Sequence, residues 1–412
     1  MEEGAPRVVY SIATGLGGTG LAQEAFEAVL GTWRQGWLEK IIVYGNRQQA
    51  IPRRFVRNIR LHPGKPLSFV PARFYYGMKM EYLDWVAARR VRRGCDLFHG
   101  WVNECCRALR AVRERGAVGF VEMPGPHAFN RRMVAFWEEE CARYGFGDMH
   151  NDTTYAGGLL AYFVTRRRKM LEEFALAHRI VVPSEFVRDT FREEGVPDEK
   201  LVLIPRGVDA ERFRPAAEPP ATFRAVFVGA IGHRKGVHYL LEAWERLGLP
   251  DGELLLAGGV QAEIAPLVAR HAGKLGVRCV GHVDPLPFYQ SASVFVFPSL
   301  SEGSAKVTYE AMACGLPVVV TPNAGSVARD GVDGLVVPVR DASALAEGIL
   351  KLYRDPDLRL TMGRAARKRA EAHTWEHYRA RILAAYADAL GLPRPDVPLF
   401  RPEAARVAGR KP

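Results

Sequence analysis

The chain lacks the long apolar run that a membrane-spanning helix requires, which is about 18 consecutive residues. This absence argues against an integral membrane protein. Its first residues, Met1 to Gly4, are acidic and lead directly into a strand-like run, so they lack the basic and apolar regions of a signal peptide. We therefore expect a cytoplasmic protein, with peripheral binding at the inner face of a membrane as an open alternative.

Metal-binding patterns are also missing. The six cysteines form no Cys-x-x-Cys pair, and most lie in apolar runs, which predicts buried, reduced thiols. No Asp-x-Asp pair follows a predicted strand. The one match, Asp355-Pro356-Asp357, falls between two predicted helices, where solvated carboxylates at a proline turn explain it. The sequence therefore predicts neither a catalytic metal nor any other bound cofactor.

The pattern of apolar residues indicates the fold class. Short apolar runs alternate with helix-period stretches through all 412 residues, which predicts an α/β fold with two Rossmann-like, doubly wound domains. A break at residues 204–209, followed by Pro215, predicts the linker. We divide the chain into residues 1–205, residues 206–375, and a C-terminal part, 376–412, whose helix returns to the first domain before a loose tail.

Predicted strands define one sheet in each domain. In the first domain they are 7–14, 40–44, 96–98, 118–121 and 179–182, and in the second 225–228, 254–257, 277–280, 294–297 and 317–320. Ligands of open α/β sheets bind beyond the carboxyl ends of the strands. Two such sheets facing each other predict a central cleft as the functional site.

A glycine-rich turn follows the first predicted strand, with the sequence Gly15-Leu16-Gly17-Gly18-Thr19-Gly20. Such glycines let backbone amides and the positive end of a helix approach a phosphate. A dinucleotide site also expects an acidic residue after the second strand, where this chain has Asn46 and Arg47. The turn is therefore a weak sign of NAD or NADP binding, and a tight turn that serves packing alone is the plainer alternative.

The strongest signal lies in residues 298–317, where a small-residue loop leads from a strand into a helix near Ala305. The loop amides from Gly303 to Lys306 are placed to meet a diphosphate. Glu310, one turn into the helix, can accept hydrogen bonds from a ribose diol, and Glu302 can accept from sugar hydroxyls. We expect Gly303, Ser304, Ala305, Lys306 and Glu310 to bind one extended donor; solvated carboxylates at a helix start are the alternative.

This segment resembles the Glu-x7-Glu motif of the retaining glycosyltransferases with the GT-B fold, called family 4 or group 1. Residues 227–237, 204–209 and 331–338 are similar to further motifs of that family, in the same order. The resemblance implies a GT-B fold and transfer of a hexose from a nucleoside-diphosphate sugar, UDP- or GDP-linked above all, with retention of configuration. It further implies that Val283 lies near the base and that Gly17 and Gly18 close over the phosphate.

One departure concerns the cations that would bind the diphosphate. Many relatives have an arginine two residues after the Val-Gly of the first strand, a position that is Ala230 here. We expect Arg234 to supply the guanidinium instead, next to Lys235. Two fixed cations at a strand end stabilise a leaving diphosphate without a metal. Lys306 stands where relatives usually have an apolar residue, which suits either an acidic donor sugar or plain solvation.

Two histidines follow strands of the first domain. Relatives often place a histidine near the transferred sugar at the position of His127, so we expect His127 to line the reaction centre. His99 is a weaker candidate of the same kind, and a hydrogen-bonded loop histidine is the alternative for both.

The formal charge of +11 is concentrated in residues 1–215, where basic and aromatic residues cluster between Arg53 and Arg93. An anionic or lipid-linked acceptor at a membrane surface would suit this cluster, but charged helix faces and a covered core are the plainer explanation. No nucleic-acid motif accompanies it. The acceptor hydroxyl could belong to a glycan, a lipid or a small polyol. Alternative functions are a GT-B hydrolase or epimerase of nucleotide sugars, an NAD(P)-dependent oxidoreductase, and a non-catalytic sugar-nucleotide binder.

Overall fold

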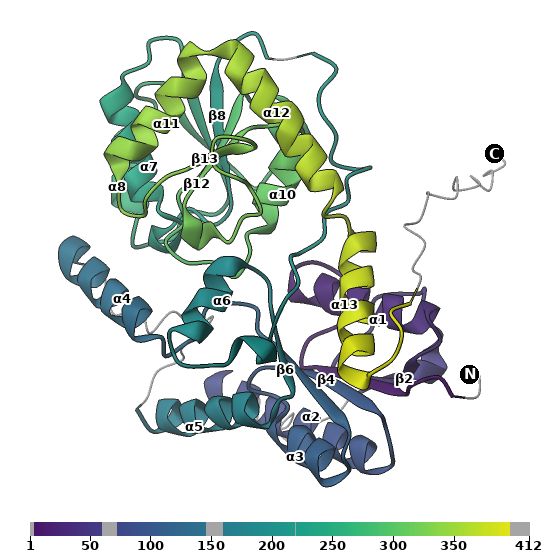
Figure 1. Cartoon of the computed structure of the whole chain (residues 1–412). Helices are drawn as coiled ribbons and strands as arrows, with labels where there is room; N and C mark the ends of the chain where they lie inside the picture. Colours follow the sequence, from purple (N-terminus) through teal and green to yellow (C-terminus); the bar gives the residue numbers. More distant parts are fainter. Residues whose placement is uncertain (1–3, 60–71, 146–159, 219, 396–412) are drawn as a thin grey trace, which may run out of the picture.

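The computed structural model describes residues 4–59, 72–145, 160–218 and 220–395, with only the backbone at 72–74 and 160–166. The predicted loose tail beyond residue 395 and the part of the basic and aromatic cluster at 60–71 lie outside the described residues. Two parallel sheets, each covered by helices, divide the described chain into two lobes (Figure 1).

The first lobe is built on a seven-stranded sheet in the order β3-β2-β1-β4-β5-β6-β7. Its strands are β1 (Val8–Ile12), β2 (Leu38–Val43), β3 (Val56–Asn58), β4 (Leu97–Trp101), β5 (Val118–Glu122), β6 (Arg179–Val182) and β7 (Leu201–Leu203). Its helices are α1 (Leu21–Arg34), α2 (Ala72–Arg92), α3 (Cys106–Glu114), α4 (Arg131–Tyr144), α5 (Leu160–Leu176) and α6 (Glu185–Arg192).

The second lobe is built on a six-stranded sheet in the order β10-β9-β8-β11-β12-β13. Its strands are β8 (Arg224–Val228), β9 (Glu253–Ala257), β10 (Val277–Gly281), β11 (Val294–Phe297), β12 (Val318–Val320) and β13 (Gly334–Val336). Its helices are α7 (Val237–Leu247), α8 (Ala265–His271), α9 (Pro285–Gln290), α10 (Lys306–Ala313), α11 (Ala342–Arg354) and α12 (Pro356–Glu371). Asp355, part of the apparent Asp-x-Asp pair, caps α12 by accepting from Leu358 N at 2.8 Å.

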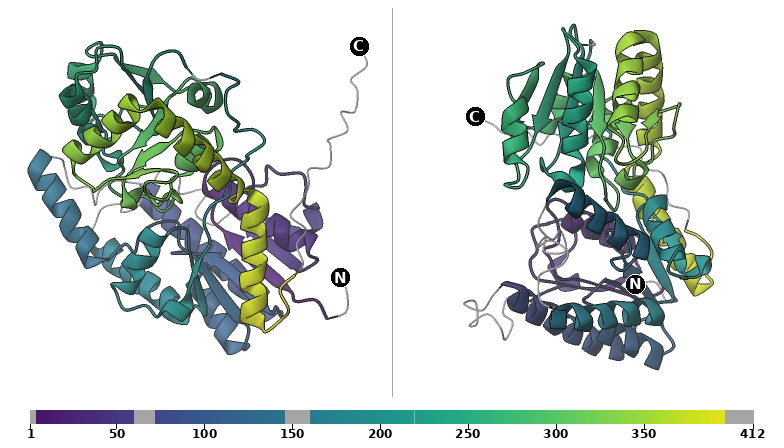
Figure 2. Two further views of the ribbon diagram at one scale, coloured as in Figure 1. Left: turned by 45° about the horizontal axis from the view of Figure 1, so that its top comes forward. Right: turned by 90° about the vertical axis from the view of Figure 1, so that its left-hand side faces the viewer.

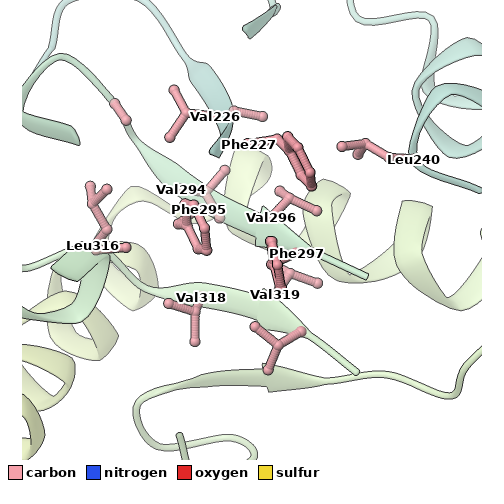
Figure 3. Packing of buried hydrophobic residues seen from close by; sticks show 14 of the residues in the cluster. Val226, Phe227, Leu240, Val294, Phe295, Val296, Phe297, Leu316, Val318 and Val319 are labelled. Atoms are coloured by element: carbon pink, nitrogen blue, oxygen red, sulfur yellow. The ribbon is translucent and has the colours of Figure 1, made fainter. Parts of the chain in front are cut away.

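The core of the second lobe explains its uninterrupted apolar strands. The ring of Phe297 stacks with two others: its centroid lies 5.4 Å from that of Phe227 and 5.9 Å from that of Phe295 (Figure 3). Valines from β8, β11 and β12 fill the space around them. A parallel sheet with helices on both faces buries both sides of its strands, which is why β11 reads Val-Phe-Val-Phe without polar alternation.

The last described helix, α13 (Trp375–Leu390), leaves the second lobe and packs on α1 of the first (Figures 1 and 2). Tyr378, Ile382 and Tyr386 are buried in one cluster with residues of β1 and α1. Arg379 pairs with Glu27 of α1. The chain therefore crosses between the lobes twice, once before β8 and once after α12.

Candidate active site

The centre of the site is Glu302, which follows β11 in the second lobe and faces two cations. Its Oε1 accepts from Arg234 Nη1 at 2.6 Å and also from Lys235 Nζ. Arg234 additionally donates to the Ser301 carbonyl at 2.9 Å. Both cations come from the 3-10 turn His233–Lys235 that follows β8, the strand beside β11. The sheet thus brings together three of the residues that the sequence analysis assigned to chemistry.

Burial and charge act in opposite directions on this cluster. Burial disfavours ionisation of Glu302, but the attraction of Lys235 and Arg234 outweighs it and lowers the pKa of the carboxyl. For Lys235, burial has the larger effect and lowers the pKa, while Glu302 opposes that change. One carboxylate against two cations leaves a net positive centre at the carboxyl ends of the strands, which can attract an anionic ligand.

Glu310 lies on α10, with only 5% of its side chain exposed. Its Oε2 accepts from the buried Tyr289 hydroxyl at 3.2 Å, and its Oε1 lies 3.0 Å from Lys306 Nζ. Lys306 is itself 41% exposed, so its ammonium can move aside for a ligand. One carboxylate oxygen is therefore held by Tyr289, and the other is available to a ligand that displaces Lys306.

The loop between Glu302 and α10 is held by the segment that follows β12. Glu302 N donates to the Asn323 carbonyl at 2.9 Å, and Ala305 N donates to the Ala324 carbonyl at 3.0 Å. The Ala305 amide is therefore occupied, whereas the amides of Gly303 and Ser304 have no partner within the described part of the chain. The Ser304 hydroxyl points inward and donates to the Gly325 carbonyl at 2.9 Å.

Gly303 is the point at which this loop contacts the first lobe. Its carbonyl accepts from the Ser184 hydroxyl at 2.5 Å. A Cβ added at Gly303 would fall 1.7 Å from the Pro124 carbonyl oxygen, so no side chain fits. The small-residue loop therefore lets the two lobes meet within one residue of Glu302.

A cavity of about 650 Å³ lies between α6 and residues 320–328, where Ser184 and Gly325 form part of its wall. Arg234, Lys235, Glu302 and Glu310 do not line it. The cavity thus lies beside the loop of Gly303 and Ser304 and is not lined by the four charged residues.

The glycine-rich turn after β1 adopts conformations that side chains rarely take, with φ of 81° at Gly17 and 122° at Gly18. A Cβ on Gly17 would lie 3.1 Å from that of Gln48, so this glycine serves packing. A Cβ on Gly18 would meet only Arg47, at 4.0 Å, so its backbone is accessible. Of the two glycines, Gly18 has the free space that a phosphate would need.

Sequence reasoning took Arg206 only as part of a linker motif. Its Nη2 lies 3.0 Å from Glu24 Oε1 on α1, and its charge acts on both Glu302 and Lys235. Burial raises the pKa of Glu24 to about 7, although Arg206 opposes this shift. Tyr289 was missed as well, because nothing in its local sequence marks the contact with Glu310.

The structure does not join the two histidines to this cluster. The His127 ring packs against Phe129, Phe174 and Phe191 of the first lobe, with centroids 6.4, 5.4 and 4.9 Å away. Its Nδ1 is buried without a hydrogen-bond partner among the described residues, and burial lowers its pKa.

His99 is completely buried beneath α13. Its Nδ1 lies 2.6 Å from the Tyr386 hydroxyl and its Nε2 lies 3.0 Å from Glu122 Oε2. These contacts match the alternative of a hydrogen-bonded histidine that serves the fold.

Val283, expected near the base, follows β10 and is 39% exposed. Within the described ranges, no helix has the length and apolar character to cross a membrane. The same ranges contain no group of three or more His, Cys, Asp or Glu side chains arranged to hold a metal ion.

Two lobes built on parallel α/β sheets, with cations and carboxylates beyond the strands of the second sheet, are the arrangement of GT-B glycosyltransferases. Family models agree: residues 38–212 match the model described as Glycosyltransferase Family 4, and residues 222–355 match Glycosyl transferases group 1. The chain belongs to this family, the family 4 or group 1 glycosyltransferases.

Three individual proteins that resemble the chain share 34%, 21% and 15% sequence identity with it. A D-inositol 3-phosphate glycosyltransferase of Kribbella flavida is 34% identical over 223 residues, which is 47% of this chain and 52% of that one. The match thus spans about half the length of the curated relative. Sucrose-phosphate synthase from Thermosynechococcus elongatus has a TM-score of 0.66 at 21% identity, covering 94% of this chain and 99% of that one. Anabaena Alr3699/HepE in complex with UDP has a TM-score of 0.66 at 15% identity, covering 93% and 100%.

Proposed function

We propose that the chain is a metal-independent, retaining glycosyltransferase that moves a hexose from a nucleoside-diphosphate sugar to an acceptor hydroxyl. The observation that carries this proposal is the pairing of Glu302 with Arg234 and Lys235, one loop away from the buried carboxylate of Glu310. Together these groups offer a carboxylate for a ribose, cations for a diphosphate, and a second carboxylate for a sugar.

In the proposed complex, the ribose hydroxyls donate to Glu310 and displace Lys306 from Oε1. The diphosphate then binds Arg234, Lys235 and the free amides of Gly303 and Ser304, and Gly18 approaches it from the first lobe. These cations stabilise the charge that develops on the departing phosphate, as a metal would. Binding of the diphosphate also releases Glu302 from part of its ion pairing, so that it can accept from the sugar hydroxyls.

The acceptor hydroxyl attacks the anomeric carbon on the face from which the phosphate leaves. Its proton passes to the departing phosphate oxygen, so the new bond forms with retained configuration and without a protein nucleophile. In this mechanism positioning and electrostatics supply the rate enhancement. His127 would act through the shape of the neighbouring loop rather than by proton transfer, since its ring lies among aromatic side chains of the first lobe.

For the donor we propose a UDP- or GDP-hexose, and the UDP complex of a protein with the same fold supports the former. For the acceptor, the name of the curated relative favours a phosphorylated polyol as the first compound to test. Glycan and lipid hydroxyls form the rest of the screen.

The decisive experiment measures thermal stabilisation by UDP, GDP, ADP and TDP, with NAD and NADP as controls, with magnesium and with EDTA, for the wild type and Glu310→Ala. We expect one nucleoside diphosphate to stabilise the wild type equally in both conditions and to lose its effect in Glu310→Ala. Glu347→Ala, which removes an exposed carboxylate from α11, is the matched control. Stabilisation only by NAD or NADP would overturn the proposal, and acceptor-independent release of nucleotide at full rate would favour the hydrolase alternative.

A further inference from the structure

Helix α4 of the first lobe extends to the second lobe, away from the two chain crossings (Figure 2). Near its end, Glu140 is only 2% exposed. Its Oε1 accepts from the Tyr239 hydroxyl at 2.9 Å and lies 2.6 Å from Arg340 Nε, and its Oε2 lies 3.5 Å from His238 Nε2. All three partners belong to the second lobe, so Glu140 is a carboxylate of one lobe buried among donors of the other.

These contacts lead directly to the cation-bearing turn. His238, in the first turn of α7, has its ring 5.0 Å from that of His233 and its Nδ1 3.5 Å from His233 Nδ1. His233 opens the 3-10 turn whose next two residues are Arg234 and Lys235. Two side-chain contacts thus separate Glu140 from the residues that pair with Glu302.

The charges around Glu140 fix its ionisation state. Burial disfavours the carboxylate, but hydrogen bonds from His238 and Tyr239 and the charge of Arg340 outweigh burial and lower its pKa. Burial and the neighbouring His238 lower the pKa of His233 to about 3, so that ring is neutral near pH 7. A neutral His233 leaves the positive charge of the turn on Arg234 and Lys235.

Aromatic packing holds α4 in place around this carboxylate. The Tyr144 ring lies 4.7 Å from the His238 ring and 5.8 Å from the Tyr239 ring. The Arg340 guanidinium lies 3.6 Å from the centre of the Phe136 ring and donates to the Phe136 carbonyl. Arg340 holds this position with a φ of 62°, a strained conformation for a residue other than glycine. The contact between α4 and the second lobe is therefore formed by defined side chains of both lobes.

We propose that Glu140 is a positioning residue for the donor diphosphate, through which α4 of the first lobe holds the Arg234–Lys235 turn of the second. This inference rests on the proposed function, because it assumes that this turn binds the diphosphate. In this proposal α4 contributes to diphosphate binding. That contribution is separate from the contact between the lobes at Gly303, Ser184 and Pro124. The ribose and base do not depend on it, since Glu310 lies on α10 and Val283 lies in the loop after β10.

The test compares Glu140→Gln with Glu139→Gln. The control, Glu139→Gln, removes the same charge from the neighbouring residue of α4. The Glu139 side chain is 70% exposed, and of the three second-lobe partners of Glu140 it contacts only Arg340. Binding of the nucleoside diphosphate that stabilises the wild type, and of the corresponding nucleoside, is measured by calorimetry. We expect Glu140→Gln to weaken diphosphate binding about tenfold while nucleoside binding stays unchanged, because the misplaced turn contacts only the phosphates.

The outcomes separate this inference from the proposed function. Wild-type protein that binds none of the four nucleoside diphosphates would defeat the proposed function itself. Wild-type binding that Glu140→Gln leaves intact, or that it weakens equally for the nucleoside, would overturn the role of Glu140. If Glu140→Gln does not fold, Tyr239→Phe, which removes only one hydroxyl donor, carries the test with a smaller selective loss as the expected result.

Discussion

Arg234 Nη1 and Glu302 Oε1 lie 2.6 Å apart, and Lys235 pairs with the same carboxylate oxygen. Arg234 and Lys235, both partly buried, come from one turn, and Glu302 comes from the loop of the neighbouring strand. The three groups neutralise one another only in part. A ligand that brings two negative phosphates can therefore replace Glu302 as the partner of both cations.

Replacing Lys235 with glutamine should lower the transfer rate roughly 100- to 1,000-fold, which is the usual effect of removing one preorganised group that stabilises developing charge. Steady-state kinetics with the donor that the binding screen selects measures this. Lys274→Gln, at an exposed position outside the site, is the control and should retain full activity. A Lys235 variant with unchanged kcat would show that Arg234 and the loop amides suffice.

Tyr289→Phe should weaken nucleotide binding by several-fold and lower stability by about 1 kcal/mol, because it removes the hydroxyl that donates to Glu310. The buried carboxylate would then lack its fixed partner and could turn towards Lys306. Calorimetric binding and thermal unfolding measure the two effects. Equal binding by both proteins would contradict the idea that Tyr289 orients Glu310.

Gly303→Ala should separate the lobes at their contact beside Glu302, because the added methyl would overlap the Pro124 carbonyl oxygen. We expect a strong loss of transfer activity with each lobe still folded. Small-angle scattering measures the spacing of the lobes. The control is Gly348→Ala on α11, where the added methyl meets only the ends of Val319, Leu335 and Val337 at 3.3 to 3.5 Å.

The contribution of Glu24 to stability should fall as the pH rises, because burial raises the pKa of this carboxyl from 4.5 to about 7. The folded state then binds this proton more tightly than the unfolded state, so the stabilisation is complete below pH 4.5 and is lost as the pH rises through 7. At pH 8, the free energy of unfolding of Glu24→Gln should be higher than that of the wild type by up to about 3 kcal/mol. At pH 4.5, the two free energies should be nearly equal. Denaturant unfolding at both pH values measures this, with the exposed Glu211→Gln as control.

The sequence predicted both sheets because buried parallel strands appear as apolar runs, as at Val294–Phe297 and at residues 180–182. Three strands were not predicted, at Val56–Asn58, Leu201–Leu203 and Gly334–Val336. Each has three residues and lies at the edge of its sheet, so its run is too short to show a strand pattern in the sequence. Strand length and edge position therefore limited the prediction.

The local part of the site could also be predicted, since Glu302, Arg234 and Lys235 all follow recognisable strands. Contacts between distant segments could not. The pairing of Arg206 with Glu24 and the burial of Glu140 among second-lobe donors depend on how the lobes pack, and neither segment carries a local pattern for them. The orientation of the His127 ring could not be predicted from the sequence either, because a position in a loop does not determine which way a side chain points.

The two chain crossings between the lobes are themselves bonded to each other. Val208 N, in the first crossing, donates to the His373 carbonyl in the second at 2.9 Å, and Val208 pairs with Thr374 as an isolated parallel bridge. A Cβ on Gly207 would lie 2.5 Å from the Trp375 ring, so the two segments are in close contact. The lobes are thus joined by two chain segments that lie side by side and are hydrogen-bonded to each other. The first lobe cannot be cut out as one continuous piece, because it contains both ends of the described chain, whereas the second lobe is a single stretch between the two crossings.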